Sequence, residues 1–398
     1  MHATQLLDKA IRKQSQAIHM KRRRALIGSV QSLLNGKKLS VTGLGRSWQS
    51  RAYEKHSIKR SDRLVGNHRL HQDRDMLYRT MAQHLIGKQR QPIIVVDWSD
   101  LSANREFHLL RASIPVGGRA LTLYEQTHPQ KLEGNPGVHE RFLAKLKAIL
   151  PKGCCPIVVT DAGFRVPWFK AVRSLGWEYV GRVGGHTMIT PQGKCDWLRV
   201  EYLFDSATTR ARYVGHVDLA RANPLSCHAY LMKKKKRGRV KKTVFGNRCL
   251  MKHSEKNAHR ERTPWLIVTS LDGGASITKR VMQLYTTRMQ IEEAFRDMKN
   301  SRWGFSLDEA RVSCAYRYDN LLLIGNLAHF AVWLVGIIAE MKQLGRHFQA
   351  NTVKTHKVLS TFYLGCRVLD RGIVFRQHEY REAMRRLEHQ AVAQHAWE

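Results

Sequence analysis

The first 90 residues have the apolar spacing of amphipathic helices. In LLDKAIRKQSQAI and RRRALIGSVQSLL, apolar residues recur at intervals of three and four positions, which is the repeat of one helix face. The stretch SVTGLGR, starting at Ser40, interrupts this pattern before the basic segment KHSIKRSDRL. We therefore predict a helical N-terminal domain over residues 1–90.

From residue 91 onward, short apolar runs alternate with helical segments. The runs Phe107–Val116 and 119–124 flank the turn signal Gly117-Gly118 and predict paired strands. In chain order the prediction is strand, strand, strand, helix, strand, helix, strand, which is typical of an α/β fold with a mixed sheet and helices on its faces. The other strands of this first core part, residues 91–183, are expected at 92–98, 156–160 and 177–183, and its helices at 138–150 and 166–175.

A different pattern begins at residue 184. Strand-like pieces stand among polar residues up to residue 263, and the run KKKKRGRVKK follows the last of them. We predict a β-rich insertion over 184–263 with an exposed basic loop, then a second core part over 264–345 and a C-terminal helical region over 346–398, where dimerisation is expected. The strand-like pieces are 197–204, 212–216 and 226–232, and the second core part starts with a strand at 264 and a helix over about 277–299.

One apolar segment, 321–339, is about long enough to span a bilayer. It contains Asn326 and His329, which a lipid-facing helix would tolerate poorly. We therefore expect a buried core helix and no membrane association.

Charge narrows the class of partner. The 398 residues carry 68 Lys+Arg against 32 Asp+Glu, a net charge of +36, and 43% are hydrophobic. This apolar content excludes a disordered basic tail, and the charge indicates a polyanion such as nucleic acid. The seven cysteines lack regular spacing, and no signal peptide opens the chain, so we expect a reduced, cytoplasmic protein. A zinc site at Cys249 and His253 is only weakly indicated.

Two basic segments are candidates for DNA contact. Residues 1–90 hold 20 Lys+Arg and 5 Asp+Glu, and a helix in the KHSIKRSDRL segment would collect several cations on one face. A solvated helix face and a disordered loop tip are the alternatives. The cations of the N-terminal candidate are Arg46, Lys55, Lys59, Arg60 and Arg63, and those of the basic loop are Lys233, Lys234, Lys235, Lys236, Arg237, Arg239, Lys241 and Lys242.

Two acids, Asp97 and Asp161, each end an apolar strand. Side chains at such positions enter the crevice where α/β sheets build their sites. A single such Asp is often a cap or a turn residue, but two on neighbouring strands suggest a metal site, because bound Mg²⁺ relieves their repulsion.

The helix YTTRMQIEEAFRDMK supplies a third acid. At about 100° per residue, Tyr285, Arg288, Glu292 and Lys299 fall within roughly 60° of one another, whereas Glu293 lies off this stripe, as does Asp297. A stripe carrying Arg, Glu and Lys suits a site where metal and phosphate meet. A surface helix with an Arg288–Glu292 ion pair explains the same spacing equally well.

These segments resemble the DDE transposases of bacterial insertion-sequence family four. The resemblance is carried by VVDWSD around Asp97, by VTDAGFRVPWFK around Asp161, and by the signature Tyr285-x2-Arg288-x3-Glu292-x6-Lys299. It extends over nearly the whole chain and is weakest in the insertion and after about residue 370.

The resemblance implies an RNase H-like core with a mixed five-stranded sheet. It implies that Asp97, Asp161 and Glu292 bind two Mg²⁺ ions, for which Mn²⁺ would substitute, and that DNA hairpins form at the transposon ends. Tyr285, Arg288 and Lys299 would then hold DNA phosphates. Trp265, from the strand before the signature helix, approximately matches the residue on which related enzymes stack a flipped base.

We therefore expect a cytoplasmic, nucleoid-associated transposase that performs cut-and-paste transposition. Its partners would be the double-stranded DNA of the terminal inverted repeats and of the target, with a homodimer in the synaptic complex. ATP is not required, because transesterification needs none and the chain has no GxxxxGK[ST] loop. A structure-selective nuclease on the same fold and a non-catalytic DNA-binding protein are the alternatives.

Overall fold

The computed structural model describes residues 2–14, 18–101, 106–235, 263–350, 352–353 and 355–393. The chain forms two compact units, unit 1 from Met1–Cys154 with Met289–Glu398 and unit 2 from Cys155–Arg288. The division into five segments that the sequence predicts stays a prediction.

The elements of unit 1 are α1 (His2–Gln14), α2 (Met20–Gly36), α3 (Val41–Arg46), α4 (Glu54–Val65), α5 (His68–Ile86), β1 (Ile93–Asp100), β2 (Phe107–Val116), β3 (Arg119–Pro129), α6 (Pro136–Ile149), α10 (Met289–Lys299), α11 (Ala315–Met341), α12 (Gly345–Phe348), α13 (Thr361–Asp370) and α14 (Gln377–Ala393).

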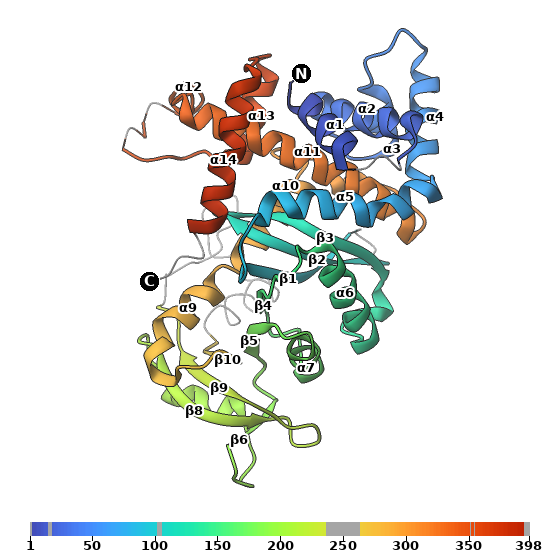
Figure 1. Cartoon of the computed structure of the whole chain (residues 1–398). Coiled ribbons are helices and arrows are strands. Elements are labelled where there is room, and N and C mark those ends of the chain that lie inside the picture. The colour runs from blue at the N-terminus through green and yellow to red at the C-terminus, as the bar shows by residue number, and fades with distance from the viewer. Residues whose placement is uncertain are drawn as a thin grey trace, which may run out of the picture. The chain divides into compact units, whose positions relative to one another are not determined.

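The N-terminal region is helical, as predicted. Helices α1 to α5 make up most of the described part of residues 1–90 (Figure 1). Side-chain caps mark where α3 and α5 begin. Ser40 Oγ accepts a hydrogen bond from Gly43 N at the start of α3, and Asn67 Oδ1 accepts one from Leu70 N at the start of α5. Such caps satisfy amide groups that have no partner within the helix.

Strands β1, β2 and β3 form the predicted antiparallel meander. Gly117 and Gly118 connect β2 to β3 with φ values of 56° and 81°, the positive values that a tight hairpin turn requires. All but the first residue of β2 are buried.

Helix α11 is the core of unit 1. Its most apolar 18-residue window has the hydropathy of a membrane span and is 100% buried inside the protein, which confirms the predicted core helix. It packs against α2, α5, α13, α14 and β3 (Figure 1). A Cβ at Gly336 would lie 2.0 Å from the carbonyl oxygen of Thr361, so this glycine permits the close approach of α13.

A buried ionic network joins α5, α11 and the meander. Arg74 on α5 donates to Asp319 on α11 (2.7 Å) and to the carbonyl oxygen of Glu125 on β3 (2.7 Å). The Glu125 carboxylate accepts from Arg111 on β2 (2.7 Å) and from Tyr78 (2.9 Å). Burial alone would raise the pKa of Asp319, but Arg74 and hydrogen bonds from His71 and Thr127 hold it below its usual value.

Unit 2 is built on a seven-stranded sheet with the order β4-β5-β10-β9-β8-β6-β7. Strands β4 and β5 are parallel, whereas β10 is antiparallel to both β5 and β9. Its elements are β4 (Ile157–Thr160), α7 (Val166–Ser174), β5 (Glu178–Val183), β6 (Met188–Pro191), β7 (Leu198–Arg199), β8 (Arg212–Leu219), β9 (Leu225–Met232), β10 (Trp265–Thr269) and α9 (Thr278–Thr286), with a 3-10 helix at Val200–Ser206.

The order of elements from β1 to β5 is the predicted one, and the α/β fold class with a mixed sheet and many helices is confirmed. Two details differ. The insertion strands continue the sheet beyond β5 and β10, so the sheet is larger than the five strands predicted. The predicted strand at 197–204 is wrong, because only Leu198–Arg199 is extended and Val200–Ser206 is a 3-10 helix.

We expect Asp319→Ala to lower the free energy of unfolding by about 3–5 kcal/mol, because it leaves the buried Arg74 guanidinium without its carboxylate. Asp62→Ala is the control, since Asp62 is 52% exposed and pairs with Arg317 at the surface; it should cost less than about 1 kcal/mol. Urea unfolding of both variants tests this, and equal losses would contradict a structural role for the buried network.

Candidate active site

Asp97 stands where the burial of β1 begins to fall. Residues Ile93 to Val96 are fully buried, and Asp97 is 9% exposed. The sequence predicted that Asp97 ends the strand. Asp97 ends only the apolar run, because the strand continues to Asp100. Trp98 N donates to Asp97 Oδ1 (2.9 Å), and Asp97 lies opposite Arg111 of β2 in the sheet.

Helix α10 packs on the face of the meander that carries Asp97. Lys299 Nζ donates to Ser99 Oγ (2.9 Å), and Ser99, two residues after Asp97, shares its face of the strand. The Arg111 guanidinium lies 4.8 Å from the centre of the Phe295 ring of α10, and residues opposite one another in a sheet share a face. Unit 1 therefore brings Asp97 and the helix of Glu292 and Lys299 to one side of the meander. Burial lowers the pKa of Lys299, which Asp308 and Asp100 partly offset.

The two acids that the helical wheel set aside have structural partners. Arg119 at the start of β3 pairs with Asp297 (2.8 Å) and Glu293 (3.7 Å). Burial raises the pKa of Asp297 to about 6 despite the cation. These contacts fasten α10 to the meander.

Asp161 directly follows β4 in unit 2, as predicted. Its Oδ1 accepts a hydrogen bond from Gly163 N (2.8 Å), which fixes the turn after the strand. Tyr285, 4% exposed, lies near Asp161. Burial raises the pKa of Tyr285. The nearby cations Arg288 and Arg182 oppose this shift, and the Asp161 carboxylate adds to it. Unit 2 therefore gathers one acid, one phenol and two cations.

Trp265 forms an aromatic pair with Tyr285. The ring centroids are 5.0 Å apart and the planes are nearly perpendicular, at 74°. The Lys234 ammonium lies over the Trp265 ring, 4.3 Å from its centre, and only 8% of Trp265 is exposed. A base could stack on this face only after Lys234 moves.

The signature is not one continuous helix. Helix α9 ends at Thr286 and α10 begins at Met289, so the prediction of a single helix over 277–299 is wrong. Thr286 Oγ1 donates to the carbonyl oxygen of Gln283, and Thr287 Oγ1 to that of Leu284. Such side-chain bonds compete with the helical backbone pattern. As a result, the first half of the signature lies in unit 2 and the second half in unit 1.

The predicted N-terminal cations are all exposed. Helix α4 buries Ser57, Ser61 and Leu64 on its other side. Two of the cations pack on aromatic rings, with the Arg60 guanidinium 4.5 Å from the Trp48 ring and the Lys55 ammonium 5.8 Å from the Tyr53 ring. Three cations of α4, Lys59, Arg60 and Arg63, therefore form an exposed face, which we call the α4 face.

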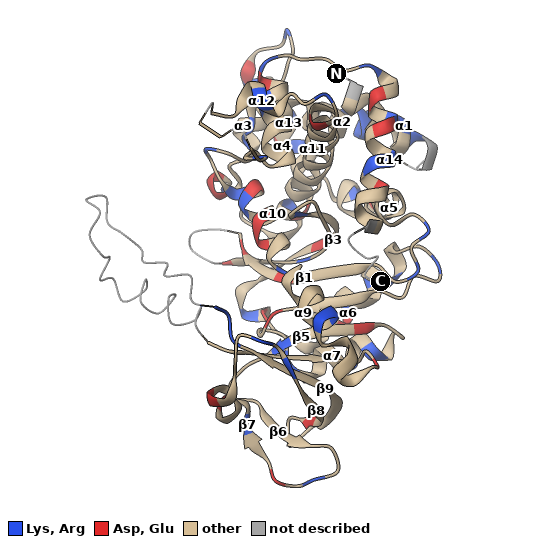
Figure 2. Ribbon diagram, turned by 90° about the vertical axis from the view of Figure 1, so that its left-hand side faces the viewer, with Lys and Arg blue, Asp and Glu red and all other residues tan. Residues whose placement is uncertain are grey.

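Arg46 differs from the other predicted cations, because it pairs with Glu54 at 3.0 Å. More generally, Lys and Arg occur on many elements of the protein rather than in a single tail (Figure 2).

Only part of the basic loop lies within the described residues. Lys233, Lys234 and Lys235 follow β9, and the last two are exposed. The zinc candidate Cys249 with His253 lies outside the described residues. So do the remaining predicted cations of the loop: Lys236, Arg237, Arg239, Lys241 and Lys242.

Sequence reasoning missed three residues around these groups: Ser99, Arg111 and Arg182. A signal existed for two of them, because Arg111 and Arg182 are cations inside largely buried strands. Ser99 carried none.

The side chains of Asp97, Asp161 and Glu292 are chemically suited to bind a divalent cation, because carboxylate oxygens are the ligands that Mg²⁺ prefers. Among the described residues, no group of three or more His, Cys, Asp or Glu side chains is assembled closely enough to hold a metal ion. Asp97 and Glu292 belong to unit 1 and Asp161 to unit 2.

Comparison with known proteins gives a family match over residues 88–312, to the transposase DDE domain. No curated protein matches the chain. The solved structures that match include a cryo-EM structure of a piggyBac transposase synaptic complex with hairpin DNA. The sequences are 12% identical, the TM-score is 0.45, and the match covers 100% of this chain and 82% of that one.

We expect the triple variant Lys59→Gln, Arg60→Gln, Arg63→Gln to bind duplex DNA more weakly and with a flatter salt dependence. Each lost phosphate contact lowers the slope of log K against log salt by about 0.9. Arg381→Gln, Arg385→Gln, Arg386→Gln is a matched control that removes the same charge from exposed positions of α14. Gel shifts at several salt concentrations measure both, and identical slopes would remove the α4 face from the DNA interface.

Proposed function

The chain belongs to the transposase DDE domain family, and we propose that it moves an insertion sequence by cutting and joining DNA strands. Within that family we place it in insertion-sequence family four, on the Tyr285, Arg288, Glu292 and Lys299 signature. The observation that carries the proposal is the packing of α10 on the Asp97 face of the meander, with Lys299 bonded to Ser99.

Asp97, Asp161 and Glu292 would hold two divalent cations, Mg²⁺ or Mn²⁺, which when bound activate the attacking oxygen and stabilise the leaving one. The proposed reaction consists of four phosphoryl transfers, which differ only in the nucleophile that attacks the phosphate. Water cuts one strand at the transposon end, and the freed 3′-hydroxyl attacks the opposite strand to form a hairpin. Water reopens the hairpin, and the 3′-hydroxyl attacks the target. Each step exchanges one P–O bond for another, so the enzyme needs no covalent intermediate and no ATP.

The signature residues orient the DNA. Tyr285 keeps its proton at neutral pH, because burial raises its pKa, and its hydroxyl can therefore donate to a phosphate oxygen. Arg288 hydrogen-bonds with Tyr285, which places a guanidinium at the same phosphate. Lys299, positioned by Ser99, offers an ammonium on the Asp97 side. Such contacts set the register of the DNA and are independent of base sequence.

Trp265 is the proposed stacking surface for a flipped base. Flipping costs a few kcal/mol, and stacking on an aromatic ring offsets part of that cost. Because the Lys234 ammonium lies over this ring, the base must displace it, and the freed ammonium would remain close to the displaced strand.

The two ends of an element must be cut together, so we propose a homodimer bridged by DNA, with the α4 face on the transposon ends and the basic loop at 233–242 on flanking, end or target DNA. The protein would then act at the bacterial nucleoid in the cytoplasm.

Two other functions remain as alternatives. A structure-selective nuclease would cut but not join strands, and a strand-transfer assay with pre-cut ends separates it from a transposase. A non-catalytic DNA-binding protein would show no Mg²⁺-dependent nicking.

Asp97→Ala, Asp161→Ala and Glu292→Ala should each abolish Mg²⁺-dependent cleavage and leave the gel shift of end DNA unchanged. The matched control is Glu293→Ala, which removes the adjacent carboxylate and should keep cleavage, because Glu293 pairs with Arg119 and Arg296. Cleavage retained by any of the first three variants would refute the triad.

Arg288→Ala should slow hairpin formation more than the first nick, because the tightly bent hairpin strand depends more on its phosphate contacts. Denaturing gels resolve nicked, hairpin and opened products over time. If both steps slow equally, Arg288 has no specific hairpin role.

A further inference from the structure

Trp303 is a large aromatic residue held at the surface of unit 1. It lies four residues beyond Lys299, in the turn after α10, and is 51% exposed, whereas Phe305, two residues further on, is fully buried. The family signature ends at Lys299 and does not include it.

The turn presents this ring rigidly. Asn300 Oδ1 accepts hydrogen bonds from the backbone amides of Arg302 and Trp303, both at 2.8 Å. A Cβ at Gly304 would lie 1.9 Å from the carbonyl oxygen of Asp297, so only glycine allows the chain to close there. The exposure of Trp303 is therefore built into the backbone, and little conformational freedom remains to be lost on binding a ligand.

Trp303 forms one wall of a hollow of about 600 Å³ between the end of α10, the β2–β3 turn and the start of α13. Tyr363 stands against it, with ring centroids 5.3 Å apart and planes at 83°. Ser360 and Val358 complete the floor. The volume is in the range of pockets that take small planar ligands.

Cations surround the hollow. The Arg302 guanidinium lies 5.6 Å from the Trp303 ring, and Arg296, exposed on α10, lines the hollow with Arg119. The acid of the hollow, Asp297, is paired with Arg119. A flat aromatic wall with guanidinium groups beside it matches a planar base attached to a phosphate.

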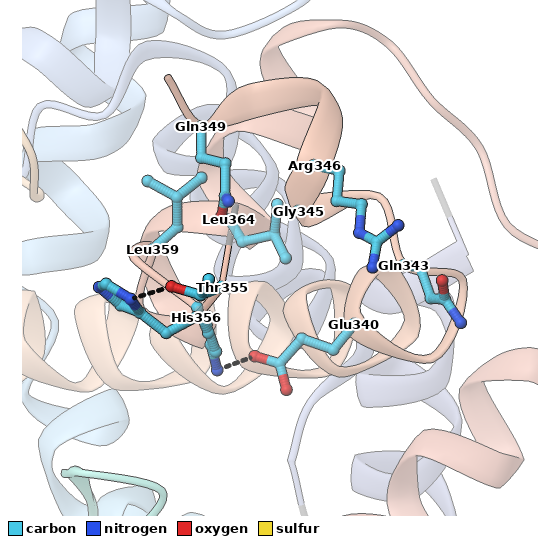
Figure 3. A pocket seen from close by; sticks show the side chains of 10 residues that line it. Glu340, Gln343, Gly345, Arg346, Gln349, Thr355, His356, Leu359 and Leu364 are labelled. Atoms are coloured by element: carbon cyan, nitrogen blue, oxygen red, sulfur yellow. Dashed lines mark hydrogen bonds and ion pairs between the residues drawn. The ribbon is translucent and has the colours of Figure 1, made fainter. Parts of the chain in front are cut away.

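The adjoining pocket around Arg346 and Glu340 offers a poorer match (Figure 3). It presents the Glu340 carboxylate, which accepts hydrogen bonds from Lys357 and Thr361. No Trp, Tyr or Phe is among the described residues that line this pocket, so it offers a base no comparable ring.

We propose that Trp303, supported by Tyr363 and flanked by Arg296 and Arg302, is a stacking site for an unpaired base of DNA. This inference rests on the proposed function, because cutting DNA ends creates single-stranded nucleotides next to the duplex. The site lies beyond the C-terminal end of α10, whereas Glu292 lies in its first turn. Trp303 would hold a strand and take no part in the chemical step.

The test compares the affinity for a blunt DNA duplex with that for the same duplex carrying a short single-stranded thymine tail. Trp303→Ala should weaken binding of the tailed duplex about five- to 150-fold, the range for one aromatic stacking contact, and leave the blunt duplex unchanged. Trp303→Phe should restore most of the loss. Tyr202→Ala is the control, since Tyr202 is also an exposed aromatic residue, at 68%, but lies in unit 2.

A second measurement locates the contact directly. With 5-iodouracil in the tail, ultraviolet light should crosslink the base to the peptide containing Trp303, as read by mass spectrometry. Equal weakening on both duplexes, or a crosslink only elsewhere, would overturn the proposal. So would a change in oligomeric state of Trp303→Ala without any effect on DNA, because the ring would then serve contact between copies of the chain.

The two proposals can fail separately. If Asp97→Ala still cleaves DNA, the proposed chemistry fails, while tail-dependent binding through Trp303 would still stand. If Asp97→Ala abolishes cleavage and Trp303→Ala binds both duplexes like the wild type, only the stacking site is wrong.

Discussion

The buried ion pair between Arg111 and Glu125 links the core of unit 1 to its acids. Both side chains are essentially inaccessible to solvent, so each charge depends on the other and on the hydrogen bonds around it. The Glu125 carboxylate also accepts hydrogen bonds from Tyr78 of α5 and Asn326 of α11, and these bonds tie both helices to the meander. On its other side, the Arg111 guanidinium packs on Phe295 of α10. Arg111 and Glu125 lie opposite one another on β2 and β3, and Arg111 also lies opposite Asp97 of β1, so the pair lies between the meander and helix α10.

Acidic side chains in this basic protein are divided between structure and chemistry. Three acids, Asp319, Glu125 and Asp297, form ion pairs with buried or half-buried arginines. Each of them is therefore costly to replace and unavailable to a metal. The acids proposed for chemistry lie instead at the ends of apolar runs or in the first turn of α10.

The end of α9 divides the signature into two sets. Tyr285 and Arg288 accompany Asp161, and Lys299 accompanies Asp97 with Glu292 on α10. Each unit therefore carries at least one acid and at least one phosphate-binding cation of the proposed site. The turn beyond α10 adds Trp303, whose exposure has a backbone cause. A strand of DNA held along α10 would meet a cation at Lys299 and an aromatic ring immediately after it.

The sequence by itself determined the helical N-terminal region, the order of strands and helices through β5 and the buried helix α11. These follow from local periodicity, because one buried face imposes its repeat on the residues of each element. Only the tertiary structure decided the break between α9 and α10, where threonine hydroxyls bond to backbone carbonyls. It also decided that the insertion strands extend the sheet and that residues 200–206 form a 3-10 helix. The exposure of Trp303 belongs to this second group, because it depends on the turn after α10, where Asn300 and Gly304 make close contacts with the backbone.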